Sequence, residues 1–147
     1  MFMGEYTHAI DDKGRLTIPV KFRADLAAGA VITRGYDKSL VLYTAEAFKH
    51  VTERAERLSP TDPENRALLR LFYSGASEAV PDRQGRILVP PYLRDYAGIT
   101  GDCVIVGVGH AMEIWSQEGW AQQLQMLNDP TVNAQRFSGL NLAPGPG

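Results

Sequence analysis

The sequence predicts an α+β protein in which two copies of one small β-rich module pack against each other. Three observations lead to this fold. The segment from Asp11 to Pro19 is repeated from Asp82 to Pro90, with Asp, Gly, Arg and Pro in matching places. A second pair of similar segments, which end near Tyr43 and Trp115, follows in the same order at nearly the same spacing. One module offers four short strands and a helix, too little for a core of its own, so we expect the halves to exchange strands.

Each module is expected to open with a strand, a glycine turn and a second strand. The first strands are expected at 4–10 and 76–80, and the second strands end at Pro19 and Pro90. Gly14 and Gly85 stand where the turn favours a positive φ, which glycine adopts without a steric penalty. A short helix can begin at each proline, because its fixed φ is tolerated in a first helical turn.

The short helix of each module is followed by a strand pair and a closing helix. The short helix carries Phe22 and Leu26 in the first copy, and Leu93 and Ala97 in the second. The strand pairs are expected at 30–34 with 40–43, and at 102–108 with 112–115. Thr44 and Ser116 then stand as N-caps, since a hydroxyl oxygen can accept a hydrogen bond from the first turn of a helix.

A further helix is expected between the modules. It begins at Asp62-Pro63-Glu64, where Thr61 and Glu64 have the spacing of a capping box. An apolar stripe at helical period follows, formed by Leu68, Leu69, Phe72 and Tyr73. The chain is thereby divided into a first module at 5–47, a helical connector at 48–75, a second module at 76–119, a C-terminal helix at 120–140 and a disordered tail at 141–147.

Composition favours a cytoplasmic protein that does not enter a membrane. No run of residues approaches the roughly 18 apolar residues that span a bilayer. Cys103 has no cysteine partner within the chain, which fits a reducing compartment. The net charge of −2 gives no support to nucleic-acid binding, because DNA-binding proteins are usually basic overall. Arginines nevertheless outnumber acids by five to two between Arg66 and Arg94.

The residues offer no pattern of a catalytic or metal site. His8, His50 and His110 have no metal-ligand spacing with one another or with Cys103. No Ser/His/Asp or Cys/His order indicates a nucleophile, and the acids are dispersed without a convincing pair. We therefore expect no enzyme, no cofactor, no metal and no small-molecule substrate.

The repeated segments resemble the MraZ family, a two-copy member of the AbrB/SpoVT-like group of swapped-hairpin DNA-binding proteins. The matching motifs are Met-Phe-Met-Gly-Glu, Asp-Asp-Lys-Gly-Arg with Ile-Pro and Phe-Arg, Leu-Phe-Tyr-Ser-Gly-Ala, Asp-Arg-Gln-Gly-Arg-Ile-Leu-Val-Pro and Glu-Ile-Trp, which together cover most of the chain. The resemblance implies a swapped-hairpin β-barrel with flanking helices. It also implies a bacterial, nucleoid-associated transcriptional regulator, here a repressor. Such a regulator binds repeated promoter elements of the cell division and cell-wall gene cluster, and does so as a ring-shaped homo-oligomer.

The resemblance further implies that the two Asp-x-x-x-Arg turns, at 11–15 and 82–86, face double-stranded DNA. Within such a turn, Asp can accept hydrogen bonds from turn amides, while Arg offers a rigid fork to phosphate or guanine. We assign DNA contact to Arg15 and Arg86, with Lys13 and Arg83 as neighbouring phosphate contacts. The residues assigned to holding the turns are Asp11, Gly14, Asp82 and Gly85.

Other functions stay open on the sequence alone. A protein-interaction adaptor would keep its function in the variants Arg15→Ala and Arg86→Ala. A small hydrolase would use Asp11 or Asp82 as its acid and would show turnover. The motif could also serve only to lock a hairpin through an ion pair, although exposed ion pairs contribute only about 0–1 kcal/mol.

Overall fold

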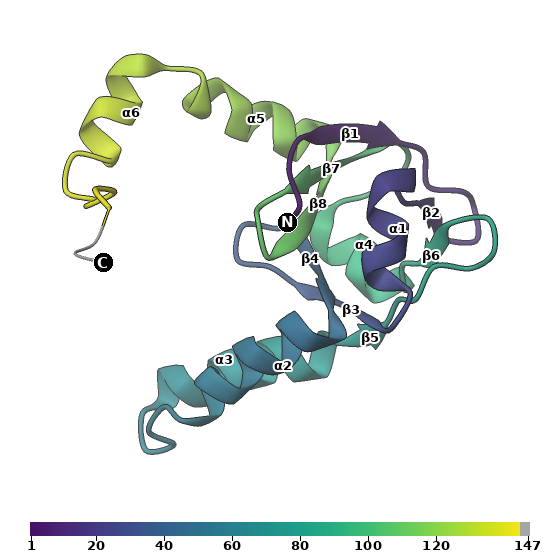
Figure 1. The fold of residues 1–147 in the computed structure, drawn as a ribbon, viewed down its shortest axis with the longest axis horizontal. Coiled ribbons are helices and arrows are strands. Elements are labelled where there is room, and N and C mark those ends of the chain that lie inside the picture. Colours follow the sequence, from purple (N-terminus) through teal and green to yellow (C-terminus); the bar gives the residue numbers. More distant parts are fainter. Residues whose placement is uncertain (145–147) are drawn as a thin grey trace.

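The order of the elements runs twice through the same series of strands and helices (Figure 1). The structure is a computed structural model and describes residues 1–144. The first series consists of β1 (Glu5–His8), β2 (Arg15–Thr17), α1 (Val20–Leu26), β3 (Ala30–Arg34), β4 (Leu40–Thr44), α2 (Ala45–Glu56) and α3 (Pro63–Gly75). The second consists of β5 (Ser77–Glu78), β6 (Arg86–Leu88), α4 (Pro91–Ala97), β7 (Cys103–Gly107), β8 (Ala111–Ser116), α5 (Gln117–Leu127) and α6 (Pro130–Arg136). We call the two series repeat 1 and repeat 2.

The strands of the two repeats are exchanged, as the sequence predicts. Within residues 1–144 they form a six-stranded sheet in the order β1-β7-β8-β4-β3-β5 and a two-stranded ribbon of β2 and β6, and all neighbours are antiparallel. Strand β1 of repeat 1 pairs with β7 of repeat 2, and β5 of repeat 2 pairs with β3 of repeat 1. Each repeat therefore supplies an edge strand to the strand pair of the other.

The two repeats share one hydrophobic core. Leu16 at the centre of β2 and Ile87 at the centre of β6 are paired in register, and each is at most 1% exposed. The helices α1 and α4 cover this core with the residues expected from the sequence, Phe22, Leu26, Leu93 and Ala97. Because core residues come from both repeats, the fold is α+β with a single shared core.

The closing helices begin where the sequence predicts. Thr44 Oγ1 accepts a hydrogen bond from Ala47 N at 3.1 Å, and Ser116 Oγ accepts one from Gly119 N at 2.9 Å. Helices α1 and α4 begin one residue later than expected. Pro19 and Pro90 therefore stand at their N-caps, with ψ angles of 135° and 152°.

The expected capping box at Thr61 is wrong. The N-cap of α3 is Asp62, whose Oδ1 accepts a hydrogen bond from Glu64 N at 2.9 Å. An Asp directly before Pro satisfies the first free amide of the helix by itself, because the proline at the next position has no N–H to satisfy.

The segment expected as one helix over 120–140 is divided in two. Helix α5 ends at Leu127, and Pro130 begins α6, because the proline ring lacks an N–H and clashes with the preceding helical turn. Asp129 caps the new helix through hydrogen bonds from the amides of Thr131 and Val132. Residues 141–144 of the expected tail are exposed and contain neither helix nor strand, and 145–147 lie outside the described residues.

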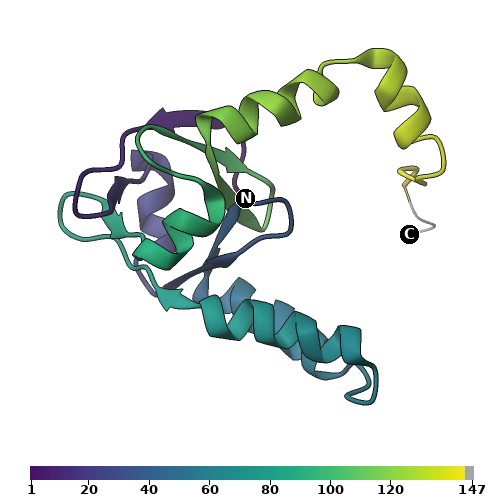
Figure 2. The same cartoon turned by 180° about the vertical axis from the view of Figure 1, so that it is seen from behind.

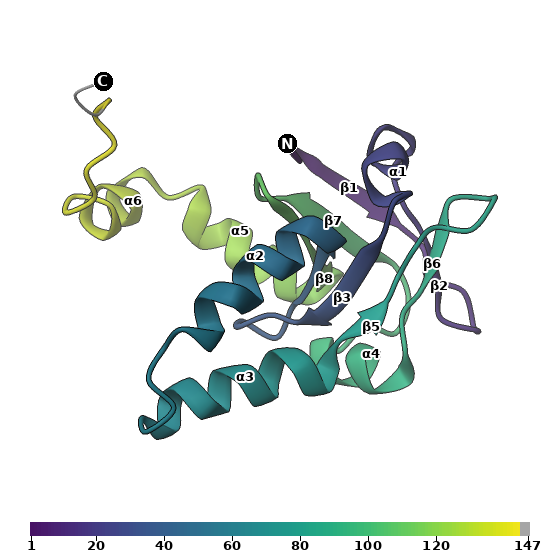
Figure 3. The ribbon, with the colours of Figure 1, turned by 60° about the horizontal axis from the view of Figure 1, so that its bottom comes forward.

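Two helical extensions leave the strands on different sides (Figure 1, Figure 2). Helices α2 and α3 lie side by side as a hairpin, and α3 also packs on β3 through a hydrogen bond of 2.7 Å from Thr33 Oγ1 to Phe72 O. Helices α5 and α6 instead form an arm that extends away from the sheet. The turns before β2 and β6 project on a third side, away from both extensions (Figure 3).

Candidate nucleic-acid interface

The turn of repeat 1 is organised by the carboxylate of Asp11. Its Oδ1 accepts hydrogen bonds from the amides of Lys13 at 3.0 Å and Arg15 at 2.8 Å. The backbone of the turn closes on the same residue, with Gly14 N donating to Asp11 O at 3.0 Å. A single side chain thus satisfies two amides that the tight turn would otherwise leave unpaired.

The turn of repeat 2 repeats this geometry. Asp82 Oδ1 accepts hydrogen bonds from the amides of Gln84 at 2.9 Å and Arg86 at 3.0 Å. Gly85 N donates to Asp82 O at 2.9 Å. The glycines have φ angles of +85° at Gly14 and +78° at Gly85, as expected from their place in the motif.

Each Asp also binds the Arg of its motif. Arg15 Nε lies 2.7 Å from Asp11 Oδ2, and the guanidinium of Arg86 reaches Asp82 Oδ2 through Nε at 3.1 Å and Nη2 at 3.0 Å. The two arginine side chains are 35% and 27% exposed. Each guanidinium is therefore held by its aspartate, within a side chain that stays partly exposed.

The turn amides and the guanidiniums stabilise the charged form of both carboxylates. The hydrogen bond from the Arg15 amide is the largest cause that holds the pKa of Asp11 below its ordinary value. The Arg86 amide does the same for the pKa of Asp82. At neutral pH both turns consequently contain an ionised aspartate paired with an arginine.

The β2–β6 ribbon brings the two turns together. Arg15 pairs with Leu88, and Arg86 pairs with Thr17, so the two arginines lie two residues apart along the ribbon, roughly 7 Å in an extended strand. Because side chains alternate along a strand, these residues share the outer face, while Leu16 and its partner face the core. The ribbon thus displays Arg15 and Arg86 on one surface.

The other basic residues of the motifs lie at the tips of the turns. Lys13 and Arg83 are exposed, and neither forms an ion pair within residues 1–144. They occupy different positions in the two turns, since Lys13 matches Gln84 and Arg83 matches Asp12. Repeat 2 therefore has one acid fewer at its tip than repeat 1.

Two further arginines contact the turns, and they lie outside the motifs. Arg23 of α1 lies against Gly85 of repeat 2, and Arg94 of α4 lies against Gly14 of repeat 1. The alignment of the repeats already pairs Arg23 with Arg94, but it gives no sign that each reaches the turn of the other repeat. That contact depends on the exchange of strands.

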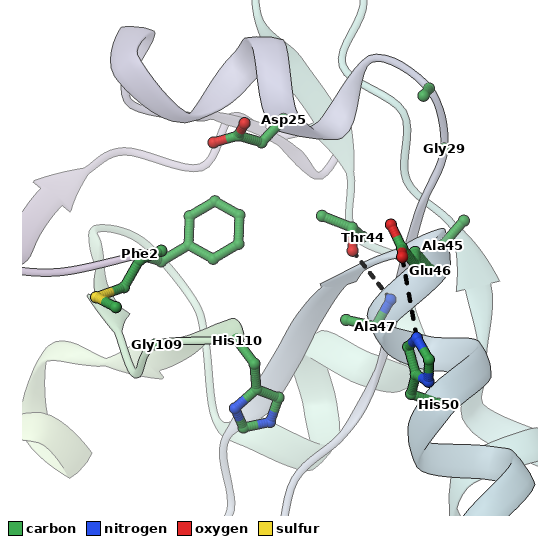
Figure 4. A pocket seen from close by; sticks show the side chains of 12 residues that line it. Phe2, Asp25, Gly29, Thr44, Ala45, Glu46, Ala47, His50, Gly109 and His110 are labelled. Atoms are coloured by element: carbon green, nitrogen blue, oxygen red, sulfur yellow. Dashed lines mark hydrogen bonds and ion pairs between the residues drawn. The ribbon is translucent and has the colours of Figure 1, made fainter. Parts of the chain in front are cut away.

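A pocket of about 640 Å³ (Figure 4) has no residue of either turn among those that line it. Phe2, Asp25 and His110 line it together with the first turn of α2. His50 Nε2 stands 3.9 Å from Glu46 Oε1 beside it. Asp11 and Asp82, the acids of the hydrolase alternative, are not among its lining residues. Throughout residues 1–144, no group of three or more His, Cys, Asp or Glu residues is placed to hold a metal ion.

No helix within the described part of the chain has both the length and the apolar character needed to cross a bilayer.

Comparison with known proteins identifies both repeats. A family model described as "MraZ protein, putative antitoxin-like" matches residues 1–71 and again 72–137. A protein of Thermomicrobium roseum named transcriptional regulator MraZ is 46% identical over 142 residues, which cover 95% of this chain and 99% of that protein. Proteins with the same name from Herpetosiphon aurantiacus and Desulfitobacterium hafniense are 48% and 46% identical, over 88% and 91% of this chain and 90% and 94% of their own lengths.

Proposed function

The chain belongs to the MraZ family, a family of transcriptional regulators and not of enzymes, and from this membership we propose that it binds DNA in a sequence-specific manner to regulate transcription. The observation that carries the proposal is the display of two Asp-x-x-x-Arg turns with one geometry on one side of the molecule (Figure 3). Arg15 and Arg86 contact the DNA. Lys13 and Arg83 add phosphate contacts at the tips, and Asp11 and Asp82 hold the turns with their glycines.

The roles of the arginines follow from their geometry. A guanidinium presents five donors in a planar fork, which matches phosphate oxygens and the O6/N7 edge of guanine. Asp11 and Asp82 restrain this fork before DNA arrives, which lowers the entropy lost on binding. Both arginine side chains stay partly exposed in these ion pairs, which allows them to meet the ligand.

The biological target is proposed from the family resemblance. The protein represses the bacterial cell division and cell-wall gene cluster at the nucleoid, by binding repeated elements in the promoter. One pair of turns binds weakly in a protein of net charge −2. An oligomeric ring places several pairs on one face, and simultaneous binding to repeated elements then raises avidity by roughly 10²–10⁴.

The arm of repeat 2 supports assembly with a second copy of the chain. Thr52 and Ala55 lie 8 and 11 residues after the N-cap of α2, and both are buried, each 5% exposed. The equivalent positions after the N-cap of α5 are Leu124 and Leu127, and Leu127 is 40% exposed. Repeat 2 thus has larger apolar side chains at the positions where repeat 1 has buried ones, and Leu127 stays partly exposed although α6 contacts α5. We propose that a second copy covers this face.

The barrel is proposed on similar grounds. The ribbon of β2 and β6 shares one core with the six-stranded sheet, and an isolated bridge between Ile10 and Leu16 links the centre of β2 to the segment after β1. These features support a swapped-hairpin barrel closed by the ribbon.

DNA binding is tested by fluorescence anisotropy with DNA from upstream of the gene, at several salt concentrations. Wild type should bind that DNA more tightly than a scrambled duplex, and affinity should fall as salt rises. Arg15→Ala and Arg86→Ala should each cost about 1–3 kcal/mol in binding free energy. The control Arg57→Ala/Arg70→Ala removes two exposed charges from the α2–α3 hairpin and should bind like wild type. If wild type does not distinguish the two duplexes, the adaptor function becomes the better explanation.

Assembly is tested by light scattering after size exclusion. Leu127→Glu places a charge on the exposed apolar face of α5 and should shift the protein towards the monomer. Gln122→Glu places the same charge on another face of the helix and should leave the oligomer unchanged. A Leu127→Glu protein with the mass of wild type would show that α5 is not the interface.

A further inference from the structure

An arginine of the other repeat packs against the side of each turn that faces the protein. A Cβ atom added to Gly85 would overlap the guanidinium of Arg23 and lie 2.6 Å from its Cδ. A Cβ added to Gly14 would lie 3.1 Å from Arg94 Cζ and 3.2 Å from its Nε. Both glycines are buried, although their neighbours Lys13 and Gln84 are exposed at the tips of the same turns. The arginines therefore cover the side of each turn that faces the protein.

Hydrogen bonds fix these arginines in place. Arg23 Nε donates to Ile18 O at 2.8 Å, at the end of the strand that leads into its own helix. Ile18 N in turn donates to Gly85 O at 2.8 Å, within the turn that Arg23 covers. Helix, strand end and the turn of the other repeat are thus joined in one connected set of contacts.

Arg94 makes the equivalent contacts with the turn of repeat 1. Arg94 Nε donates to Val89 O at 3.1 Å, and Val89 N donates to Gly14 O at 2.8 Å. Arg94 also lines a hollow of about 450 Å³ together with Asp11 and Asp12 of the turn. No hydrogen bond or ion pair engages the Nη atoms of Arg23 or Arg94 within residues 1–144, so these arginines contact the turns mainly by packing.

We propose that Arg94 positions the turn at 11–15 and that Arg23 positions the turn at 82–86, so that each repeat depends on the other for the shape of its DNA-binding turn. The inference rests on the proposed DNA-binding function, because the turns are held for Arg15 and Arg86 to bind. A planar guanidinium fills the space over the glycine, which the narrow ammonium of lysine does not, although lysine preserves the charge. Charge alone therefore does not replace the arginine.

The crossed arrangement predicts which residues are energetically coupled. Residues that act through one contact network give non-additive effects, whereas distant residues give additive ones. Arg94 should couple to Arg15, whose turn it holds, and not to Arg86 of its own repeat. Arg23 should couple to Arg86 and not to Arg15.

A double-mutant cycle on DNA affinity tests this coupling. Arg94→Lys should weaken binding roughly tenfold in the wild-type background and again in Arg86→Ala. In Arg15→Ala the same change should cost less than about twofold, because the turn no longer contributes its main contact. Arg23→Lys should show the reverse dependence. The control Arg70→Lys, at an exposed position of α3, should have no effect in any background.

Amide hydrogen exchange measured by NMR provides a test that does not require DNA. Arg94→Lys should speed exchange at Gly14 and Arg15 and leave Gly85 and Arg86 unchanged, whereas Arg23→Lys should do the opposite. This crossed pattern in a protein that shows no preference for its promoter would retain the positioning role and reject the DNA-binding function. Faster exchange in both turns, in neither turn, or only in the turn of the same repeat would overturn the positioning role.

Discussion

Asp11 and Asp82 show how an acidic residue can stand inside a turn that we propose to bind DNA. Each carboxylate accepts hydrogen bonds from two turn amides and one guanidinium, so its charge is offset within the turn itself. Exposed ion pairs alone contribute little to stability. The main structural effect of the aspartates comes from their hydrogen bonds with the turn amides. These bonds fix the shape of the turns that carry Arg15 and Arg86.

The pH dependence of the turns follows from these hydrogen bonds. Because folding lowers the pKa of Asp11 and Asp82, the stability that they contribute is fully present above the pKa of an unfolded aspartate. It is lost as the pH falls through the lower pKa of the folded state. NMR titration of the two side-chain carboxyl carbons should therefore give midpoints below that of aspartate in an unstructured peptide. Midpoints at or above the peptide value would contradict the hydrogen-bonded turn.

The ribbon of β2 and β6 is the element that makes the two turns one site. It consists of three residue pairs, and its inner face is the pair of Leu16 and Ile87, which are almost fully buried. The outer face carries the arginines. The register of the ribbon therefore turns Leu16 and Ile87 toward the core and places both arginines on the outer face.

Loss of packing beneath the ribbon should affect both turns at once. Leu16→Ala removes a buried side chain and leaves a cavity, so the free energy of unfolding should fall by about 2–5 kcal/mol. Urea denaturation measures this loss. The matched change Leu88→Ala, on the outer face where the side chain is 56% exposed, should cost far less. Equal costs at the two positions would contradict the assignment of the inner and outer faces.

Local elements could be predicted from the sequence because their signals are local. Thr44 and Ser116 cap helices, and Gly14 and Gly85 take positive φ, since each requires only its own neighbours. The cap at Asp62 is not predicted, because Thr61 has a competing capping-box spacing one residue earlier. The contacts of Arg23 and Arg94 could not be predicted, because they depend on which strands of the two repeats pair.

Neither repeat is complete by itself, so we expect the whole chain to fold as one unit. Strand β1 has its partner β7 in the other repeat, and β5 has its partner β3 there as well. The repeat in the sequence predicts this exchange from the small size of each module, but the strand order and register require the structure. The contacts of Arg23 and Arg94 with the turns also cross from one repeat to the other.

The exchange of strands predicts that neither half folds alone. Cutting the chain in the exposed link between α2 and α3 gives fragments 1–60 and 61–147. Fragment 1–60 keeps β1 and β3 but loses their partners β7 and β5, and fragment 61–147 loses β1 and β3. Each fragment also exposes its half of the shared core, so burial cannot offset the entropy of ordering the chain. Circular dichroism and NMR should show each fragment largely unfolded, and an equimolar mixture should recover the spectrum of the intact protein.

A control separates the effect of the cut from the effect of isolation. Full-length protein with a protease site in the same link should stay folded after cleavage, because the link is exposed and carries none of the pairing between strands. A cooperative unfolding transition in either isolated fragment would show that a single repeat can close its own core. In that case the two turns would be able to form independently, and the crossed roles of Arg23 and Arg94 would lose their structural basis. Unfolded fragments that regain structure only together would instead show that the folded core and both turns require both repeats.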